Sequence, residues 1–217
     1  MKKTLLQSLL AISFGATLMT ACGDGTDGKP DPQPEPTDVV EVAAEISADT
    51  TWTADKVYLL KTHTFVTGGT LTIEPGTIVK GDGASALVIT RNAKINAVGT
   101  ADKPIVMTSA KADGERVAGD WAGLVMLGNG AINASGGEVQ VEGFPANTSA
   151  ALFGGGANPD NTHDCGTLKY VRIEFAGFEI TTDNEINGLT LGACGSDTEI
   201  DYVQVHKGSD DGVEIFG

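Results

Sequence analysis

The sequence predicts an all-β protein that folds as a right-handed parallel β-helix. Three observations lead to this fold class: short apolar–polar alternations recur along the chain, most of them end at Gly, Asn or Asp, and several of these units resemble one another. No stretch beyond residue 21 shows a 3.6-residue apolar period over the roughly 11 residues that a helix needs. The content of 29 glycines and 6% aromatic residues also suits short strands joined by sharp corners.

The predicted strands begin at about residue 46 and continue to the end of the sequence. Each has three to five residues in which apolar and polar side chains alternate, the pattern of a strand with one buried side. Examples are residues 71–73, 87–89, 105–107, 171–173, 203–205 and 213–215.

Several units are related at fixed spacings. LTIEPGTIV (71–79) resembles LVITRNAKI (87–95) at an offset of 16 positions. Tyr170-Val171 recurs 32 positions later as Tyr202-Val203, and Gly188-Leu189 recurs 24 positions later as Gly212-Val213. Similarity at such spacings indicates a solenoid whose coils stack on one another.

A β-sandwich or jelly roll is the alternative fold. It would use hairpins, in which Asn-Gly or Asp-Gly joins two strands of matching length. Here Asn187-Gly188 and Asp211-Gly212 stand immediately before their strands, as corner residues of a solenoid would. The β-helix therefore remains the preferred prediction.

The two ends of the predicted solenoid differ. Residues 46–66 are expected to form an N-terminal cap, in which Trp52, Val57, Tyr58 and Leu59 cover the first coil, because a bare sheet edge would recruit other strands. The sequence ends at Gly217, in the middle of a predicted coil, so we expect a domain 46–217 that is truncated at its C-terminus.

The first 21 residues have the features of a secretory signal peptide. Lys2 and Lys3 precede an apolar run, and Thr20 and Ala21 are small residues at the expected cleavage point. The segment LMTAC (18–22) resembles the lipobox of bacterial lipoproteins, which implies lipidation of Cys22. Two or more acyl chains hold a protein durably at a membrane.

Residues 22–45 are expected to form the lipidated cysteine and a tether. The sequence after Cys22 is rich in Gly, Pro and Asp and has no apolar period. Prolines at alternate positions favour an extended, semi-rigid chain. Gly23, rather than Asp, follows Cys22, and by resemblance to sorted lipoproteins this implies the outer membrane, with the domain facing the periplasm or the cell surface.

The formal net charge of −15 limits the partners. Nucleic acid requires a basic surface, so we expect no nucleic-acid binding. Glycans, cations or another surface protein are the compatible partners, besides the membrane reached through the lipid.

Five segments together resemble a known family. They are TLTIEPGTIVKGD (70–82), GDWAGLVMLG (119–128), LKYVRIEFAG (168–177), EINGLTLG (185–192) and IDYVQVHKGSDDGVEIFG (200–217). The chain is similar to exported, often lipid-anchored parallel β-helix proteins of Gram-negative bacteria. This resemblance implies the fold and the cell envelope, but it carries over no catalytic residue.

Cys165 and Cys194 are predicted to form a disulfide. Each begins a Cys-Gly corner shortly before a Tyr-Val strand, so adjacent coils can bring them together. Stacked strands lie about 4.8 Å apart, within the roughly 4.4–6.8 Å that a disulfide requires between Cα atoms. An oxidising periplasm favours the bond.

Polar side chains on the outside of the predicted C-terminal coils are the candidates for chemistry. If Val171 stacks on Val203 and Leu189 on Val213, alternation directs five side chains outward. These are Arg172, Glu174, Gln204, His206 and Glu214.

In that register Glu174 lies over His206, and the corner with Asp210 and Asp211 lies beside them. Paired carboxylates on the outer face of a β-helix can act as acid and base on a glycan. The Asp-Asp pair resembles that of polygalacturonases, but their His-Gly and Arg-x-Lys elements are absent. Solvated corner aspartates explain the same residues without catalysis.

Calcium is a further candidate ligand. Asp183, Asp201, Asp210 and Asp211 offer the hard oxygen atoms that it prefers, although no segment matches an EF-hand loop. Otherwise we expect no cofactor.

The preferred functional hypothesis is a lipid-anchored envelope protein whose β-helix presents a binding or structural surface, with glycan as the first ligand class. The alternative is a polysaccharide lyase or glycoside hydrolase that acts on the outer face. We expect the non-enzymatic role in preference to the enzymatic one.

Overall fold

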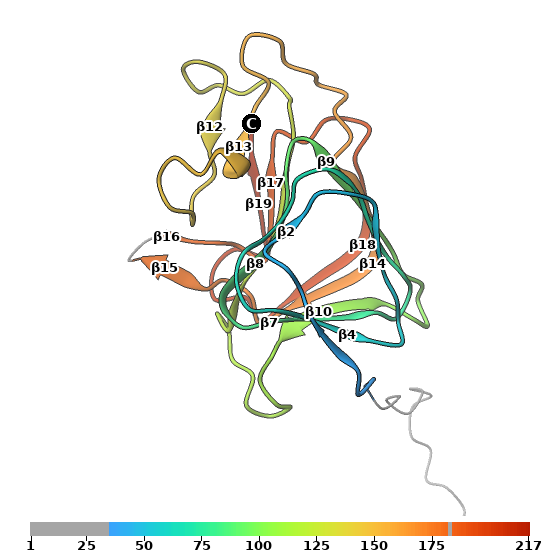
Figure 1. Ribbon diagram of the computed structural model, residues 1–217. Coiled ribbons are helices and arrows are strands. Elements are labelled where there is room, and N and C mark those ends of the chain that lie inside the picture. Colours follow the sequence, from blue (N-terminus) through green and yellow to red (C-terminus); the bar gives the residue numbers. More distant parts are fainter. Residues whose placement is uncertain (1–34, 182–183) are drawn as a thin grey trace, which may run out of the picture. The chain divides into compact units, whose positions relative to one another are not determined.

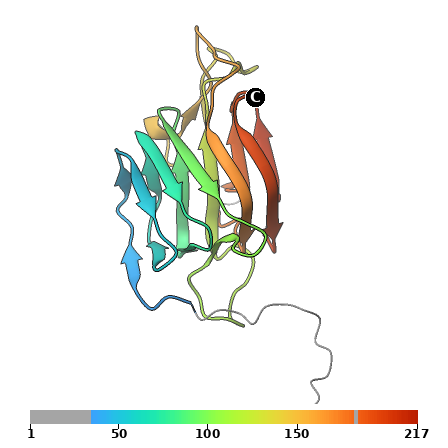
Figure 2. The same cartoon turned by 90° about the vertical axis from the view of Figure 1, so that its right-hand side faces the viewer.

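The computed structural model describes residues 35–181 and 184–217. Its parallel strands wind around a common axis and form three faces that enclose a triangular core (Figure 1); two of these faces belong to one nine-stranded sheet. Seen from the side, the coils stack in chain order from the N-terminal to the C-terminal end (Figure 2). The right-handed parallel β-helix predicted from the sequence is thereby confirmed.

Face 1 is the sheet that lies lowest in Figure 1. It contains β1 (Val39–Glu41), β4 (Val57–Leu60), β7 (Ile78–Gly81), β10 (Ile105–Ser109) and the second halves of β14 (Gly166–Glu174) and β18 (Glu199–His206).

Face 2 contains β2 (Glu45–Ile46), β5 (Thr64–Val66), β8 (Gly83–Ile89), β11 (Trp121–Leu127), β17 (Leu189–Gly192) and β19 (Val213–Phe216). Face 3 contains β3 (Thr50–Trp52), β6 (Gly69–Ile73), β9 (Ala93–Val98) and the first halves of β14 and β18. Strands β14 and β18 turn from face 3 to face 1 at Tyr170 and Tyr202, which both have positive φ.

Strand pairing tests the predicted spacings. Val171 pairs with Val203, Glu174 with His206, and Leu189 with Val213, so these spacings are confirmed. The offset of 16 is wrong as a stacking register, because Leu71 lies on face 3 and pairs with Ile95. Leu87 lies on face 2 and pairs with Thr64, so that resemblance relates two faces rather than two coils.

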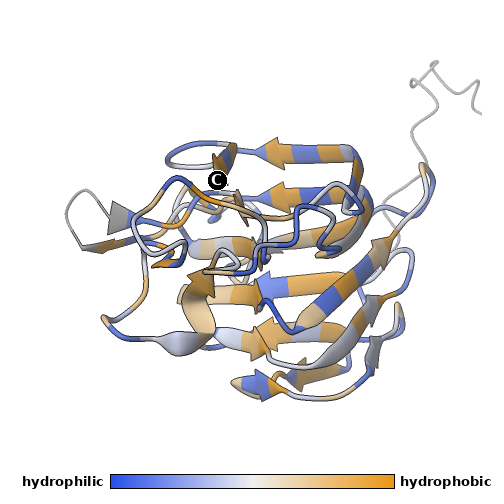
Figure 3. Ribbon diagram, turned by 90° about the horizontal axis from the view of Figure 1, so that it is seen from above, coloured by the Kyte–Doolittle hydropathy of each residue, from blue (hydrophilic) through white to orange (hydrophobic). Residues whose placement is uncertain are grey.

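The core follows from the alternation of side chains, which appears as bands of apolar and polar colour along the strands (Figure 3). Inward residues such as Leu60, Leu87, Ile105 and Trp121 are completely buried. Each buried aliphatic side chain contributes roughly 1.5–3 kcal/mol of transfer free energy. Because the coils repeat, this burial is continuous along the axis.

The N-terminal end differs from the expected cap. Strands β1, β2 and β3 form the first coil, and residues 57–66 supply β4 and β5 of the second. Of the residues expected to cover the end, Val57 and Leu59 belong to face 1 of that second coil. Trp52 stacks on Tyr58 with ring centroids 4.8 Å apart, and both rings are buried in the core.

A long excursion between β11 and β14 covers the outer side of face 2. It contains β12 (Val139–Gln140), the 3-10 turn η1 (Ser149–Ala151) and β13 (Leu152–Phe153). Its side chains Val141, Phe144 and Phe153 pack against the outward residues of β8 and β11 as a second apolar cluster. A second, shorter hairpin is formed by β15 (Glu179–Thr181) and β16 (Asn184–Glu185).

The predicted disulfide between Cys165 and Cys194 is present, with a Cα–Cα distance of 5.7 Å. It joins the residue before β14 to the corner after β17. No helix among the described residues has the length and apolar character needed to cross a membrane. The proposed signal peptide and Cys22 lie outside the described residues.

Candidate binding groove

The outer side of face 1 carries an aliphatic column that changes to polar residues towards the C-terminus. Strand register aligns Val39 with Val57, Val57 with Ile78, and Ile78 with Val106. The next two residues of the column are Arg172 and Gln204. The N-terminal coils therefore offer an apolar strip on the outside of the solenoid.

A groove of about 360 Å³ lies over the N-terminal half of this strip. Val39, Val57 and Leu59 are the apolar residues at its floor, and its walls carry charged side chains. Val57 is only 2% exposed, so Val39 and Leu59 offer most of the apolar surface. The lining residues beyond the floor are Glu35, Pro36, Lys61, Lys80, Asp82, Ala110 and Lys111.

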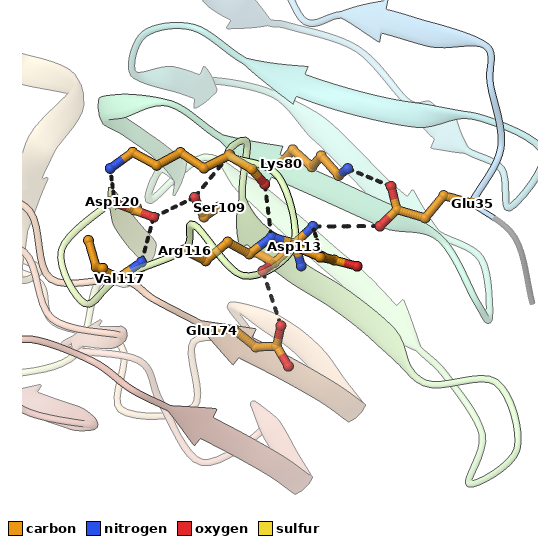
Figure 4. Close-up of polar contacts among 10 residues, drawn as sticks. Glu35, Lys80, Ser109, Asp113, Arg116, Val117, Asp120 and Glu174 are labelled. Carbon is orange, nitrogen blue, oxygen red and sulfur yellow. Dashed lines mark hydrogen bonds and ion pairs between the residues drawn. The ribbon is translucent and has the colours of Figure 1, made fainter. Parts of the chain in front are cut away.

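One wall depends on the loop 110–120, which connects β10 to β11. The side chain of Asp120 is 2% exposed and accepts hydrogen bonds from Ser109 Oγ at 2.7 Å and Lys111 Nζ at 2.5 Å. It also accepts one from the backbone N–H of Val117 at 2.9 Å (Figure 4). Burial alone would raise the pKa of Asp120, but these donors outweigh it and hold the pKa below its usual range. Asp120 therefore remains ionised and fixes the loop.

Every cation around the groove faces a carboxylate. Lys61 pairs with Asp82 at 3.0 Å. Glu35 lies between Lys80 and Arg116, with Arg116 Nη2 3.7 Å from the carboxylate (Figure 4). Arg116 also binds Asp113 at 2.8 Å. The groove thus presents alternating donors and acceptors at little net charge, although the whole chain carries −15.

Two residues of the predicted catalytic site lie farther along the same face. Glu174 and His206 are register partners. Glu174, however, is only 8% exposed, and its carboxylate accepts hydrogen bonds from Thr108 Oγ1 at 3.0 Å and Arg172 Nη2 at 2.5 Å. Alternation predicts that Glu174 points outward, and these contacts bury its side chain on that outer side.

Asp210 and Asp211 lie at the corner between β18 and β19, and both are exposed. Their charges act on Glu214 of β19. Burial, a hydrogen bond with Glu142 and its charge, and then the charges of Asp211 and Asp210 raise the pKa of Glu214 to about 7. Asn187 Nδ2 donates to the Glu214 carboxylate. A carboxyl pair, Glu142 and Glu214, therefore lies at the outer side of face 2.

Of the predicted calcium ligands, Asp201, Asp210 and Asp211 lie among the described residues and belong to no metal-binding group there. Within residues 35–181 and 184–217, no group of three or more His, Cys, Asp or Glu side chains is placed to hold a metal ion. Asp201 is exposed on β18, and Asp183 lies outside the described residues. We therefore assign no metal to the described part of the chain.

The groove was not identified from the sequence. Its lining residues come from four segments that are distant in the sequence. Coil stacking brings these segments together, so that Leu59 and Lys80, 21 positions apart, are register partners. A correct coil period would have aligned these two residues. Glu142 belongs to the excursion, where no period applies.

Comparison with known proteins gives one match. Residues 44–217 match the family model described as a pectate-lyase-like β-helix domain. No curated protein and no solved structure gives a significant match to the chain.

Proposed function

The chain belongs to the family of pectate-lyase-like β-helix domains, and we propose that it is a lipid-anchored envelope protein that binds a glycan in the groove on face 1. The family description fits a binding or structural role as well as action on a polysaccharide. The choice between them rests on the sites of this chain, because a fold alone does not specify a function.

The observation that carries the proposal is the composition of the groove. Sugar rings have apolar C–H surfaces and a rim of hydroxyl groups, so their sites need an apolar floor with donors and acceptors beside it. Val39 and Leu59, above the buried Val57, supply such a floor, and Lys61 and Asp82 supply a donor and an acceptor at its edge. Ligand sites typically combine an apolar surface with a small number of precisely placed polar groups.

The solenoid supports an extended ligand rather than a compact one. Face 1 continues beyond the groove through β10, β14 and β18, and Arg172 and Gln204 extend the outward column. Long, regular surfaces of this kind suit polymers.

Attachment at Cys22 is the second part of the proposal. It is supported by the apolar leader, the small residues before Cys22 and the proline-rich segment after it. In metabolic labelling with a palmitate analogue, we expect the full chain to be labelled and Cys22→Ser to lose the label. A Cys22→Ser protein that keeps its label would contradict the anchor.

The groove is tested by a variant that fills it. Ala110 lines the groove, so Ala110→Trp places an indole there without removing an ion pair. In calorimetric titrations with neutral hexasaccharides of glucose, xylose and mannose, we expect the wild type to bind at least one and Ala110→Trp to lose it. The matched control is Ala101→Trp at an exposed corner away from the groove. Equal binding by Ala110→Trp and the wild type would exclude the groove.

A polysaccharide lyase or hydrolase is the second candidate function, favoured by the Glu142–Glu214 pair. A carboxyl group with a pKa near 7 can donate a proton to a leaving group at neutral pH. Release of reducing ends or unsaturated product from a polysaccharide, abolished by Glu214→Gln, would support this candidate. Activity that survives both Glu214→Gln and the double variant Asp210→Asn/Asp211→Asn would exclude this site.

A further inference from the structure

Glu35 is the most exposed member of the three-residue charge cluster at one end of the groove. One of its carboxylate oxygens pairs with Lys80, and the other lies 3.7 Å from Arg116 Nη2 (Figure 4). The side chains of Lys80 and Arg116 are only 18% and 13% exposed, whereas that of Glu35 is 41% exposed. The two cations are thus built into the protein, and the carboxylate covers them from outside.

Arg116 keeps its position without Glu35. Its Nε donates to the backbone carbonyl of Lys111 at 3.0 Å, and its Nη2 pairs with Asp113 at 2.8 Å. The Asp120 network fixes the loop that carries it. Arg116 does not itself line the groove, but Glu35, which it contacts, does, so the guanidinium would stay at that end of the groove if the carboxylate left.

The Lys80 ammonium, in contrast to the Arg116 guanidinium, depends on Glu35 for its counter-charge. Its Cα position is fixed by pairing of β7 with β4 and β10. In residues 35–181 and 184–217, no carboxylate other than that of Glu35 forms an ion pair with it. Loss of Glu35 would leave a largely buried ammonium group without a counter-charge, a situation that favours binding of another anion.

Glu35 itself is held weakly. It lies between Pro34 and Pro36, before the first strand at Val39. A partly exposed ion pair contributes little net free energy, because water screens it and ordering the side chains opposes it. A ligand carboxylate that gains the same two cations, together with contacts to the groove floor, can therefore compete with it.

We propose that Lys80 and Arg116 form a carboxylate-binding site whose present occupant is Glu35 of the chain itself, so that an acidic saccharide enters the groove by displacing the segment before β1. This inference rests on the proposed glycan function and adds to it the ligand class and a competing internal ligand. The displacement is an exchange of ion pairs, in which no covalent bond changes.

The test uses two oligosaccharides with the same backbone. One is the β-1,4-linked glucose hexamer, and the other is the same hexamer with each C6 oxidised to a carboxylate. Glu35→Gln removes the internal competitor but keeps the shape of the side chain. We expect it to bind the carboxylated hexamer about three- to tenfold more tightly than the wild type, and the ratio of its affinities for the carboxylated and the neutral hexamer to rise.

The control for net charge is Glu74→Gln, an exposed position outside the groove lining. Arg116→Gln and Lys80→Gln are expected to abolish the preference for the carboxylated hexamer. If Glu35→Gln and Glu74→Gln change its affinity equally, the effect is one of total charge and the proposal is wrong.

A second readout separates failure of this inference from failure of the glycan function. Glucuronate monomer is titrated into Glu35→Gln while the Arg116 Nε–H resonance is followed by NMR. A shift that Lys80→Gln prevents would support the carboxylate site even if no hexamer binds. No shift, combined with hexamer binding that Ala110→Trp abolishes, would reject the carboxylate site and retain the groove.

Discussion

Tyr170 and Tyr202 stack face to face, with ring centroids 4.4 Å apart and ring planes within 4° of parallel. Both residues have positive φ, at 49° and 53°, and both form the corner between faces 3 and 1 in successive coils. The next corner repeats the arrangement: Phe175 and Lys207 also have positive φ, and the ammonium of Lys207 lies 5.5 Å from the Phe175 ring centroid. The corners of these two coils thus share the same backbone conformation, and their side chains contact each other from one coil to the next.

The tyrosine stack should contribute measurably to stability although Tyr202 is 63% exposed. We expect Tyr202→Ala to lower the free energy of unfolding by about 0.5–1.5 kcal/mol, the usual size of an aromatic pair. Tyr202→Phe should keep most of it, because the ring remains. Urea denaturation measures both. Equal stabilities of Tyr202→Ala and the wild type would show that the stack has no energetic role.

The disulfide should matter more than any single surface contact. Cys165 and Cys194 are separated by 29 residues, and closure of a loop of that length stabilises the fold by about 3–4 kcal/mol in the chain-entropy treatment. We expect the double variant Cys165→Ala/Cys194→Ala to unfold at correspondingly lower urea concentration. Reduction of the wild type should give a similar shift, and no shift under reducing conditions would contradict the prediction.

Gly81 should not accept a side chain. A Cβ built there would lie 2.6 Å from Trp121 Cε3, and the indole is completely buried, so it cannot move aside. We expect Gly81→Ala to cost about 1–3 kcal/mol through overpacking. At Gly212 the nearest atom to a new Cβ is 3.8 Å away, and Gly212→Ala is the matched control. Similar unfolding midpoints for the two variants would show that the core adapts.

Glu214 should make stability depend on pH near neutrality. Its pKa is raised to about 7 from an ordinary value of 4.5, so the folded state binds more protons than the unfolded state between these values. The contribution of Glu214 to stability should therefore fall as the pH rises from 4.5 to 7. His63 and His163, whose pKa values burial lowers from 6.5, act in the opposite direction within this range, so the prediction concerns the difference in slope between the wild type and Glu214→Gln. Unfolding free energies measured across that range check the sign.

Asp120 acts in the opposite direction at lower pH. Its pKa is lowered from 3.8, so its contribution is present at neutral pH and is lost only as the pH falls below that value. The two effects occupy different pH windows.

A stability that rises between pH 4.5 and 7 in the wild type, but not in Glu214→Gln, would contradict the assignment of Glu214.

Much of the fold could be predicted because stacked coils place similar residues at equivalent positions. Tyr170 and Tyr202 carry this signal, and so do Leu189 and Val213. The offset of 16 was misleading for a physical reason: each face of a coil is also a strand followed by a corner, so Leu71 and Leu87 resemble each other without stacking.

The sites were harder to predict because their residues are distant in sequence. Glu35, Lys80 and Arg116 meet through coil stacking and a loop inserted between β10 and β11. Glu142 reaches Glu214 because the excursion folds back through Phe144 and Phe153, whose burial no periodic pattern signals. Asp210 and Asp211 remain candidates predicted from the sequence, and in the structure their charges help to raise the pKa of Glu214.

The most direct test of the account is methyl NMR of the protein titrated with a neutral hexasaccharide that it binds. Val39, Val57 and Leu59 form the groove floor, so their methyl resonances are expected to shift with ligand concentration along one binding curve. Shifts confined to Val141 and Val213, which immediately precede Glu142 and Glu214 in the sequence, would instead place the ligand outside the groove and contradict the proposed function.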